Sequence, residues 1–192
     1  MKKSVGSKTL AMPAPLWLIG SYDDAGMPDM MAAAWCGICC SQPAAVTVSL
    51  RKATYSYDAI VARKAFTVNI PSESMIEKAD YMGTVSGRDQ DKFKDCGLTA
   101  VRSQLVDAPY MEEAPLVIEC RLIHTFEAGL HTMFVGEIAD VKVEETMMGE
   151  KGYPDITKVK PVVWDPSHCG YYGIGAYLGQ AWQLGKSLKI QE

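Results

Sequence analysis

Short apolar runs, several of them β-branched, alternate with turn-forming residues along most of the chain. Runs of this kind are typical of β-strands, and short links rich in glycine, proline or aspartate are typical of hairpins. Two such links, 23–28 and 127–131, predict hairpins between neighbouring strands. The predicted strands are 16–22, 29–40, 44–51, 65–70, 116–126, 132–143 and 160–164.

Helical patterns interrupt these strands in a few places. Residues 54–64 predict one helix, and residues 73–82 predict another with Ser72 as its N-cap. The polar segment 83–95 predicts a surface loop or a short helix, and long loops in compact domains are often functional. Because strands dominate and hairpins join neighbours, we predict a mainly β fold. It is an antiparallel Greek-key barrel with a few short helices, formed by a single domain over 1–192.

Composition narrows the class of protein without identifying its function. The chain has 192 residues, of which 48% are hydrophobic, so it can bury a sizeable core. Its formal net charge is -4, so no basic surplus favours nucleic acid as a partner. No apolar run is long enough for a membrane-spanning helix, and no signal sequence is evident. We therefore expect a cytoplasmic protein without nucleic-acid or membrane partners.

One cysteine motif suggests thiol redox chemistry. The segment 35–39, WCGIC, resembles the WCxxC motif of thiol oxidoreductases, whose first cysteine sits at a helix N-terminus. Pro43 disfavours a helix that starts at Cys36, so thiol chemistry is the less favoured alternative. We prefer to interpret these cysteines as small strand residues that face a ligand or the core. In a cytoplasmic chain all six cysteines are expected to be reduced, and Cys120 is expected to pack in the core.

A zinc site is a further hypothesis for the cysteines. Cys36, Cys39 and Cys40 could join His168 and Cys169 as ligands. Structural zinc ligands usually come as two spaced pairs, and adjacent strand residues point to opposite faces. We therefore expect no metal.

The segment 49–56, SLRKATYS, combines features that suit a phosphate. A predicted strand ends in two cations, Arg51 and Lys52, and hydroxyl residues then open a helix. Helix N-terminal N–H groups, cations and hydroxyls together bind phosphate well. The alternative is a solvated strand end with an ordinary Thr or Ser N-cap.

The chain has three histidines, and each is a candidate catalytic residue. His124 lies within a predicted strand, His131 in a hairpin link near a barrel mouth, and His168 in a loop. From the residues alone a structural role is favoured for each, and no Ser-His-Asp arrangement follows from the spacing.

Taken in order, several segments resemble a known family. They are PLWLIGSYDDAGMPDMMAAAWCGICC (15–40), VTVSLRKATYSYDAI (46–60), AFTVNIPS (65–72), SGRDQDKF (86–93) and HTMFVGEI (131–138). This set resembles the flavin-reductase-like FMN-binding proteins with a split β-barrel, and within them most resembles the flavoredoxins. The resemblance runs from about Pro15 to Trp164 and depends on the ordered set, since no single segment is decisive.

The resemblance implies a fold and an activity. The fold would be an antiparallel split barrel that forms a homodimer with one FMN per protomer. The protein would be an FMN-dependent oxidoreductase that passes electrons from NAD(P)H or a redox protein, through bound FMN, to an acceptor. The alternative within the family is a non-catalytic electron carrier that only a partner protein reduces.

The resemblance also implies site residues, and we carry these over as expectations. Those around the flavin ring would be Asp29, Trp35, Ser56, Lys92, His131 and Trp164, with the strand 31–34, including Met31 and Ala33, along the ring. The phosphate would lie by Arg51, Lys52 and Thr54, and Ser49 completes the cofactor-binding set.

Individual roles follow from the same resemblance. Lys92 would favour flavin reduction electrostatically, because reduced flavin carries negative charge near its pyrimidine edge. His131 is the catalytic candidate, as a hydrogen-bond partner of the ring or a gate for nicotinamide. Three positions depart from the expected pattern: Asp29 replaces Asn, Ser56 replaces Thr and Trp164 replaces Phe. Asp29 is expected to lower the flavin potential.

Overall fold

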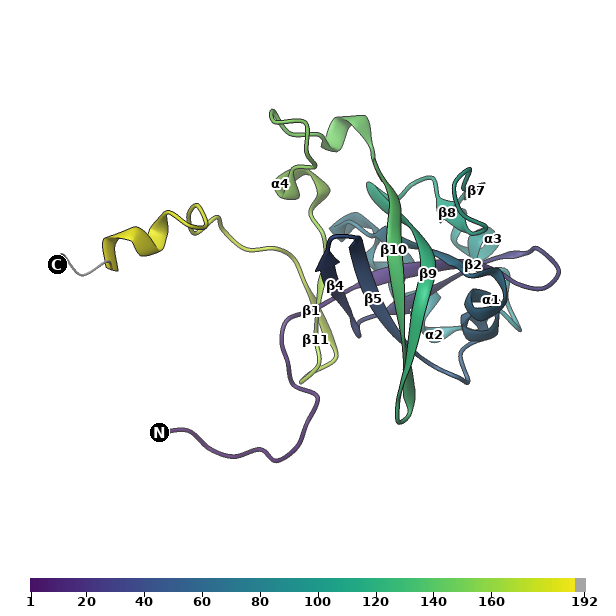
Figure 1. Cartoon of the computed structure of the whole chain (residues 1–192), viewed down its shortest axis with the longest axis horizontal. Coiled ribbons are helices and arrows are strands. Elements are labelled where there is room, and N and C mark those ends of the chain that lie inside the picture. Colours follow the sequence, from purple (N-terminus) through teal and green to yellow (C-terminus); the bar gives the residue numbers. More distant parts are fainter. Residues whose placement is uncertain (189–192) are drawn as a thin grey trace.

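A strongly curved antiparallel sheet dominates the computed structural model, which describes residues 1–188 (Figure 1). Within these residues the large sheet has seven strands in the order β3-β2-β6-β9-β10-β5-β4. Their bounds are β2 (Trp17–Tyr22), β3 (Pro28–Ala33), β4 (Cys36–Ser41), β5 (Ala44–Arg51), β6 (Ala65–Ile70), β9 (Leu116–Ala128) and β10 (His131–Val143). The mainly β, antiparallel prediction is confirmed.

The sheet curves until its two edges share one core. Ala33 of the edge strand β3 and Val48 of β5, near the other edge, belong to the same buried cluster. Phe66 and Phe134 fill this cluster from the central strands, and both are fully buried. The backbone N–H of Ser49 donates to the carbonyl oxygen of Trp35 (2.9 Å), which ties the segment between β3 and β4 to β5. The result is a barrel with its opening beside Trp35.

The smaller elements surround this barrel. One short sheet holds β1 (Ala14–Pro15), β11 (Val163–Asp165) and β12 (Gly170–Tyr172), and another holds β7 (Ala100–Arg102) and β8 (Pro109–Met111). The helices are α1 (Tyr55–Arg63), α2 (Ile76–Thr84), α3 (Lys92–Cys96) and α4 (Ile156–Val159), with short 3-10 turns η1 (Glu73–Met75), η2 (Glu145–Met147) and η3 (Leu184–Leu188). No helix within residues 1–188 has the length and apolar character needed to span a membrane.

Strand β3 is held between two packed layers. On one side Ala33 faces the barrel core, and on the other Met30 packs with Met82 of α2 and Phe93 of α3. The closeness of this packing is visible at Gly83, where an added Cβ would lie 3.0 Å from the Ala32 Cβ. The outward face of β3 is thus pressed against the end of α2.

Three predicted elements are wrong in detail. The predicted strand 160–164 is reduced to β11, because Lys160 ends helix α4. The run 29–40, predicted as one strand, is two strands broken at Ala34 and Trp35, because the chain there crosses from one edge of the sheet to the other. The predicted helix 73–82 starts as a 3-10 turn and ends at Thr84. Ser72 precedes that turn, but its hydroxyl bonds the Ser74 hydroxyl (2.8 Å) instead of capping the backbone.

The remaining predictions agree more closely with the structure. Strands 44–51 and 65–70 are confirmed residue for residue, and the hairpin of β9 and β10 is confirmed with a shorter link. Segment 83–95 holds a loop followed by most of α3. Cys120 is fully buried, as expected. The terminal segments extend away from the barrel (Figure 1).

Candidate functional site

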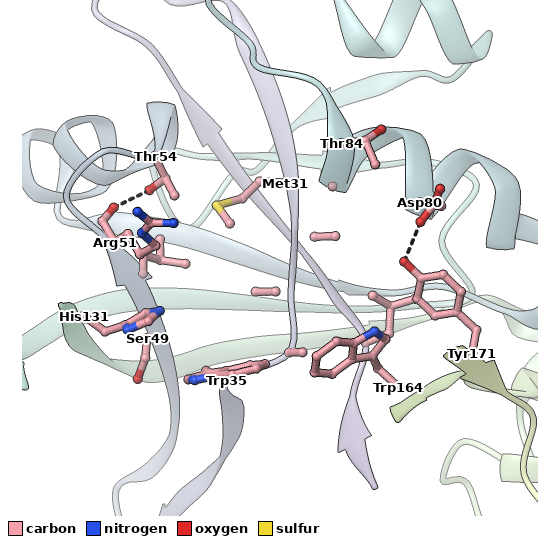
Figure 2. Close-up of a pocket in the computed structure, with 16 residues that line it drawn as sticks. Met31, Trp35, Ser49, Arg51, Thr54, Asp80, Thr84, His131, Trp164 and Tyr171 are labelled. Carbon is pink, nitrogen blue, oxygen red and sulfur yellow. Dashed lines mark hydrogen bonds between the residues drawn. The ribbon is translucent and has the colours of Figure 1, made fainter. Parts of the chain in front are cut away.

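A cavity of about 320 Å³ opens where the β3–β4 break meets the end of β5 and the end of α2. Residues 31–34 pass through it, and small alanines at 32, 33 and 34 leave the backbone accessible. Figure 2 shows Arg51, Met31 and Asp80 on one side and His131, Trp35 and Trp164 on the other. The full lining is Leu16, Met31, Ala32, Ala33, Ala34, Trp35, Ser49, Leu50, Arg51, Thr54, Asp80, Gly83, Thr84, His131, Trp164 and Tyr171.

Three aromatic side chains form a row along this cavity. The rings of Trp35 and His131 are nearly parallel, with centroids 6.3 Å apart and planes at 16°. On its other side Trp35 meets Trp164, with centroids 5.4 Å apart and planes at 44°. Trp35 lies in the break between β3 and β4, and His131 pairs in register with Arg51 across β10 and β5. The row provides aromatic surface of the kind that planar rings contact.

A tyrosine and a carboxylate face each other at the far end of the same cavity. The Tyr171 hydroxyl donates to Asp80 Oδ1 at 2.7 Å (Figure 2). Burial, together with this hydrogen bond, raises the pKa of Tyr171 to about 12, so the hydroxyl remains a donor at neutral pH. This contact ties β12 to α2 and closes that end of the cavity.

A second cavity, of about 280 Å³, continues from the first towards α1. The two share Met31, Ala32, Thr54, Gly83 and Thr84, so they are neighbouring halves of one elongated site. The second half is the more polar, and we call it the polar end and the first half the aromatic end. The polar end is lined by Asp29, Met31, Ala32, Ala53, Thr54, Tyr55, Ser56, Met82, Gly83, Thr84, Val85, Ser86, Gly87, Arg88 and Lys92.

A buried ion pair lies at the polar end. Lys92 Nζ is 3.1 Å from Asp29 Oδ1, and the two side chains are only 3% and 6% exposed. The same ammonium donates to the carbonyl oxygens of Met30 (2.7 Å) and Met82 (3.4 Å). The Ser56 hydroxyl donates to Asp29 Oδ2 at 3.1 Å. Buried charges of this kind persist only when they are paired and hydrogen-bonded, as here.

Two arginines flank the turn that leads into α1. The side chain of Thr54 donates to the carbonyl oxygen of Arg51 (2.8 Å) and makes no capping hydrogen bond to the helix. Arg88 donates to the carbonyl oxygen of Ala53 (3.2 Å), and its guanidinium lies over the Tyr55 ring, 5.4 Å from the centroid. A helix N-terminus between two guanidinium groups is a favourable place for an anion.

The structure brings together most of the residues expected at the site. The aromatic end holds Met31, Ala33, Trp35, Ser49, Arg51, Thr54, His131 and Trp164, and the polar end holds Asp29, Ser56 and Lys92. Lys52 instead points to Glu127, with Nζ 3.0 Å from Oε2, and its side chain is 64% exposed.

Other lining residues were not anticipated. Arg88 and Gly87 belong to the segment 86–93, where a polar loop was the local signal. Asp80 and Tyr171 carry no local signal, because they are 91 positions apart and meet only in the folded chain.

The cysteine hypotheses find little support in this geometry. Cys36 begins strand β4, and burial raises the pKa of its thiol to about 12, whereas reactive cysteines have lowered pKa values. Cys39 and Cys40 are exposed, and all six cysteines are free thiols. Within residues 1–188 no three His, Cys, Asp or Glu side chains are grouped to hold a metal ion.

Comparison with known proteins agrees with this geometry. Residues 9–171 match the family model described as flavin reductase like domain. The structure of flavoredoxin from Desulfovibrio vulgaris (Miyazaki F) is similar with 53% identity and a TM-score of 0.93, covering 97% of this chain and 100% of that one. Flavoredoxin from Methanosarcina acetivorans is 31% identical with a TM-score of 0.91, covering 98% and 99% of the two chains.

A curated relative adds a functional context. The reductase component of FADH(2)-dependent resorcinol hydroxylase from Rhizobium sp. is 26% identical over 106 residues, which cover 55% of this chain and 56% of that protein. The expected split-barrel fold and the flavin-dependent redox function are confirmed. The chain is a flavin-binding redox protein and belongs to the flavin reductase like domain family.

Proposed function

We propose that the chain binds FMN in the elongated site and passes electrons from a reduced donor through it to an acceptor. The observation that carries this proposal is the continuity of an aromatic, apolar end with a cationic, hydroxyl-lined end. FMN has matching parts: a planar tricyclic ring, a polyhydroxyl chain and a phosphate. Cavities of about 320 and 280 Å³ together suit such a molecule, since ligand sites usually span roughly 300–1,000 Å³.

The ring fits the aromatic end. Alanines at 32–34 allow a planar ring to approach the backbone, and Trp35 and Trp164 offer it apolar surface. His131 lies beside Trp35 at the edge of the cavity, and we assign it the catalytic role of bonding the ring or gating the donor.

The phosphate fits the start of α1, where the aromatic end, lined by Arg51, meets the polar end, lined by Arg88. The N-terminus of α1, the Thr54 hydroxyl and the two guanidinium groups of Arg51 and Arg88 would hold it. In this assignment Asp29, Ser56 and Lys92 lie nearer to the phosphate of FMN than to its ring. Arg88 takes the phosphate-binding role expected for Lys52, because Lys52 pairs with Glu127.

Bound FMN would supply the reversible redox centre for the reaction. The protein's own groups would bind and orient it and keep water away from one of its faces. Trp35, at 38% exposure, leaves the site reachable from solvent for a nicotinamide or for a docked redox protein. We propose NAD(P)H as the donor, and the alternative is a carrier that only a partner protein reduces.

Anaerobic mixing of the FMN-loaded protein with NADH or NADPH tests the enzyme proposal. Bleaching of the flavin band by either nucleotide is the expected result. No bleaching by either, with rapid bleaching by a reduced ferredoxin-like protein, would establish the carrier instead. No bleaching by any of these donors would reject both forms of the proposal.

We also propose that the whole chain forms one flavin-binding domain that assembles as a homodimer in the cytoplasm. Ile38 on the edge strand β4 is 83% exposed, and Leu178 and Trp182 in the C-terminal segment are 90% and 88% exposed, which favours burial against a second copy. The free thiols fit a reducing compartment. Light scattering on a size-exclusion column should give twice the 21.0 kDa of the chain, and a monomer mass would reject the dimer.

A further inference from the structure

The ion pair at the polar end uses all the hydrogen-bonding capacity of Lys92. An ammonium has three hydrogens. In Lys92 they are directed at Asp29 Oδ1 and at the carbonyl oxygens of Met30 and Met82. While Asp29 is ionised, Lys92 therefore has a full set of protein acceptors and a counter-charge.

The surrounding chain fixes the Asp29 carboxylate in this position. Its second oxygen accepts a hydrogen bond from the Ser56 hydroxyl (3.1 Å). The loop backbone at Gly87 packs directly on it, because an added Cβ would lie 2.5 Å from Asp29 Oδ1 and 2.5 Å from Tyr55 Cδ1. Asp29 is thus held between α1 and the loop, beside Lys92.

The consequence is electrostatic. Arg51 and Arg88 contribute two positive charges around the start of α1, whereas Lys92 and Asp29 together contribute none. An Asn at position 29 would keep the shape and one acceptor oxygen, with an NH2 group in place of the other, but would leave the Lys92 charge unbalanced. Because Lys92 is 3% exposed, water would screen that charge poorly, and a bound phosphate would become its counter-ion.

We propose that Asp29 sets the affinity of this site for phosphorylated flavin by neutralising Lys92. Asp29 is a positioning residue in this account, because it acts through Lys92. The inference rests on the proposed function, namely an FMN phosphate at the polar end.

Equilibrium titration of the wild type and Asp29→Asn with FMN and with riboflavin tests this directly. Riboflavin has the same ring and lacks the phosphate, so the ratio of the two affinities isolates the polar end. We expect Asp29→Asn to raise the FMN-to-riboflavin ratio about tenfold, the equivalent of one charge-assisted contact. An unchanged or lower ratio in a folded variant would overturn the inference.

Asp58→Asn is the matched control. It removes an equal charge from an exposed position in the first turn of α1, outside the ion pair. Solvent screens that charge, so the ratio of FMN affinity to riboflavin affinity should change less than about threefold. An increase equal to that of Asp29→Asn would mean that net charge, and not the ion pair, controls affinity, and would reject the proposal.

A double variant keeps the test valid if Asp29→Asn fails to fold. Asp29→Asn with Lys92→Met removes both charges together, so no unpaired charge is left buried. If Asp29 already cancels Lys92, the double variant should keep the wild-type ratio within about threefold. A tenfold fall would show that Lys92 assists phosphate binding despite Asp29, which contradicts the inference.

The outcomes distinguish a failure of the proposed function from a failure of the role proposed for Asp29. If the wild type binds neither flavin, the proposed function fails. If the wild type prefers FMN to riboflavin and Asp29→Asn leaves the ratio unchanged, the proposed function stands and the role of Asp29 is rejected.

Discussion

The two ends of the site are built on different principles. The aromatic end is built around ring faces and alanines, with Trp35 in contact with His131 on one side and Trp164 on the other. The polar end is built on the buried, mutually neutral Asp29–Lys92 pair, with Arg88 at its surface. The aromatic row and the alanines recognise a planar ring, and Arg51 and Thr54 lie where this end meets the polar end. The polar end can distinguish a phosphorylated ligand from one without phosphate. The two contributions are therefore separable by mutation.

The largest expected effect comes from breaking the buried pair on one side. Lys92→Met would leave Asp29 buried without its counter-charge, because the side chains are only 3% and 6% exposed. Removal of one partner of a buried pair typically costs about 3–5 kcal/mol. Urea unfolding of the apo protein should show this loss, and the double variant with Asp29→Asn should recover most of it. A loss below about 1 kcal/mol would mean that the pair is not buried in solution.

The next effect distinguishes the two ends by ligand. Arg51→Ala should weaken FMN binding by about 1.5–3 kcal/mol, the value of a charge-assisted contact, and leave riboflavin binding nearly unchanged. Arg88→Ala should act in the same direction, since the Arg88 guanidinium bonds the Ala53 carbonyl oxygen and the Arg51 side chain lies beside Thr54 (Figure 2). Lys52→Ala is the comparison variant, because that ammonium pairs with Glu127. If Lys52→Ala weakened FMN more than Arg51→Ala did, the phosphate assignment would be refuted.

A smaller effect is expected at the aromatic end, with the opposite ligand pattern. Trp35→Leu removes the central member of the aromatic row and should weaken FMN and riboflavin equally, by about 0.5–1.5 kcal/mol. The titrations described for Asp29 measure both affinities. A loss of affinity for FMN alone would mean that Trp35 contributes to phosphate binding. The division of the site into two ends would then be wrong.

The smallest expected effect concerns the cysteines. A variant with Ser at both 36 and 39 should retain the wild-type rate of electron transfer, because the Cys36 thiol is protonated at neutral pH, with burial raising its pKa to about 12, and Cys39 is exposed. Stopped-flow reduction of the bound flavin measures this. Loss of electron transfer with flavin still bound would restore thiol chemistry as the function.

The parts of the fold that depend on local pattern were predictable. Strands 44–51 and 65–70 matched because each is an apolar, β-rich run bounded by turn residues. The break at Trp35 was not predictable, because the run 29–40 is continuous in composition and only closure of the barrel interrupts it.

The residues of the site also divide into those predictable from local sequence and those that meet only in the folded chain. The cations and hydroxyls of 49–56 lie together in the sequence, so the local pattern alone predicts a phosphate site. Asp80 and Tyr171 meet across 91 positions, and the neutralisation of Lys92 by Asp29 requires two distant elements to pack together. Single-sequence patterns carry no information about such contacts, and the electrostatic role expected for Lys92 changes once its partner is known.

The most direct test of the two-ended site is calorimetric titration of the purified apo protein with FMN and with riboflavin. The account predicts that both bind, with one flavin per chain, and that FMN binds at least about tenfold more tightly because only FMN engages the polar end. Equal affinities would contradict the phosphate site at α1, and no binding of either flavin would contradict the account as a whole.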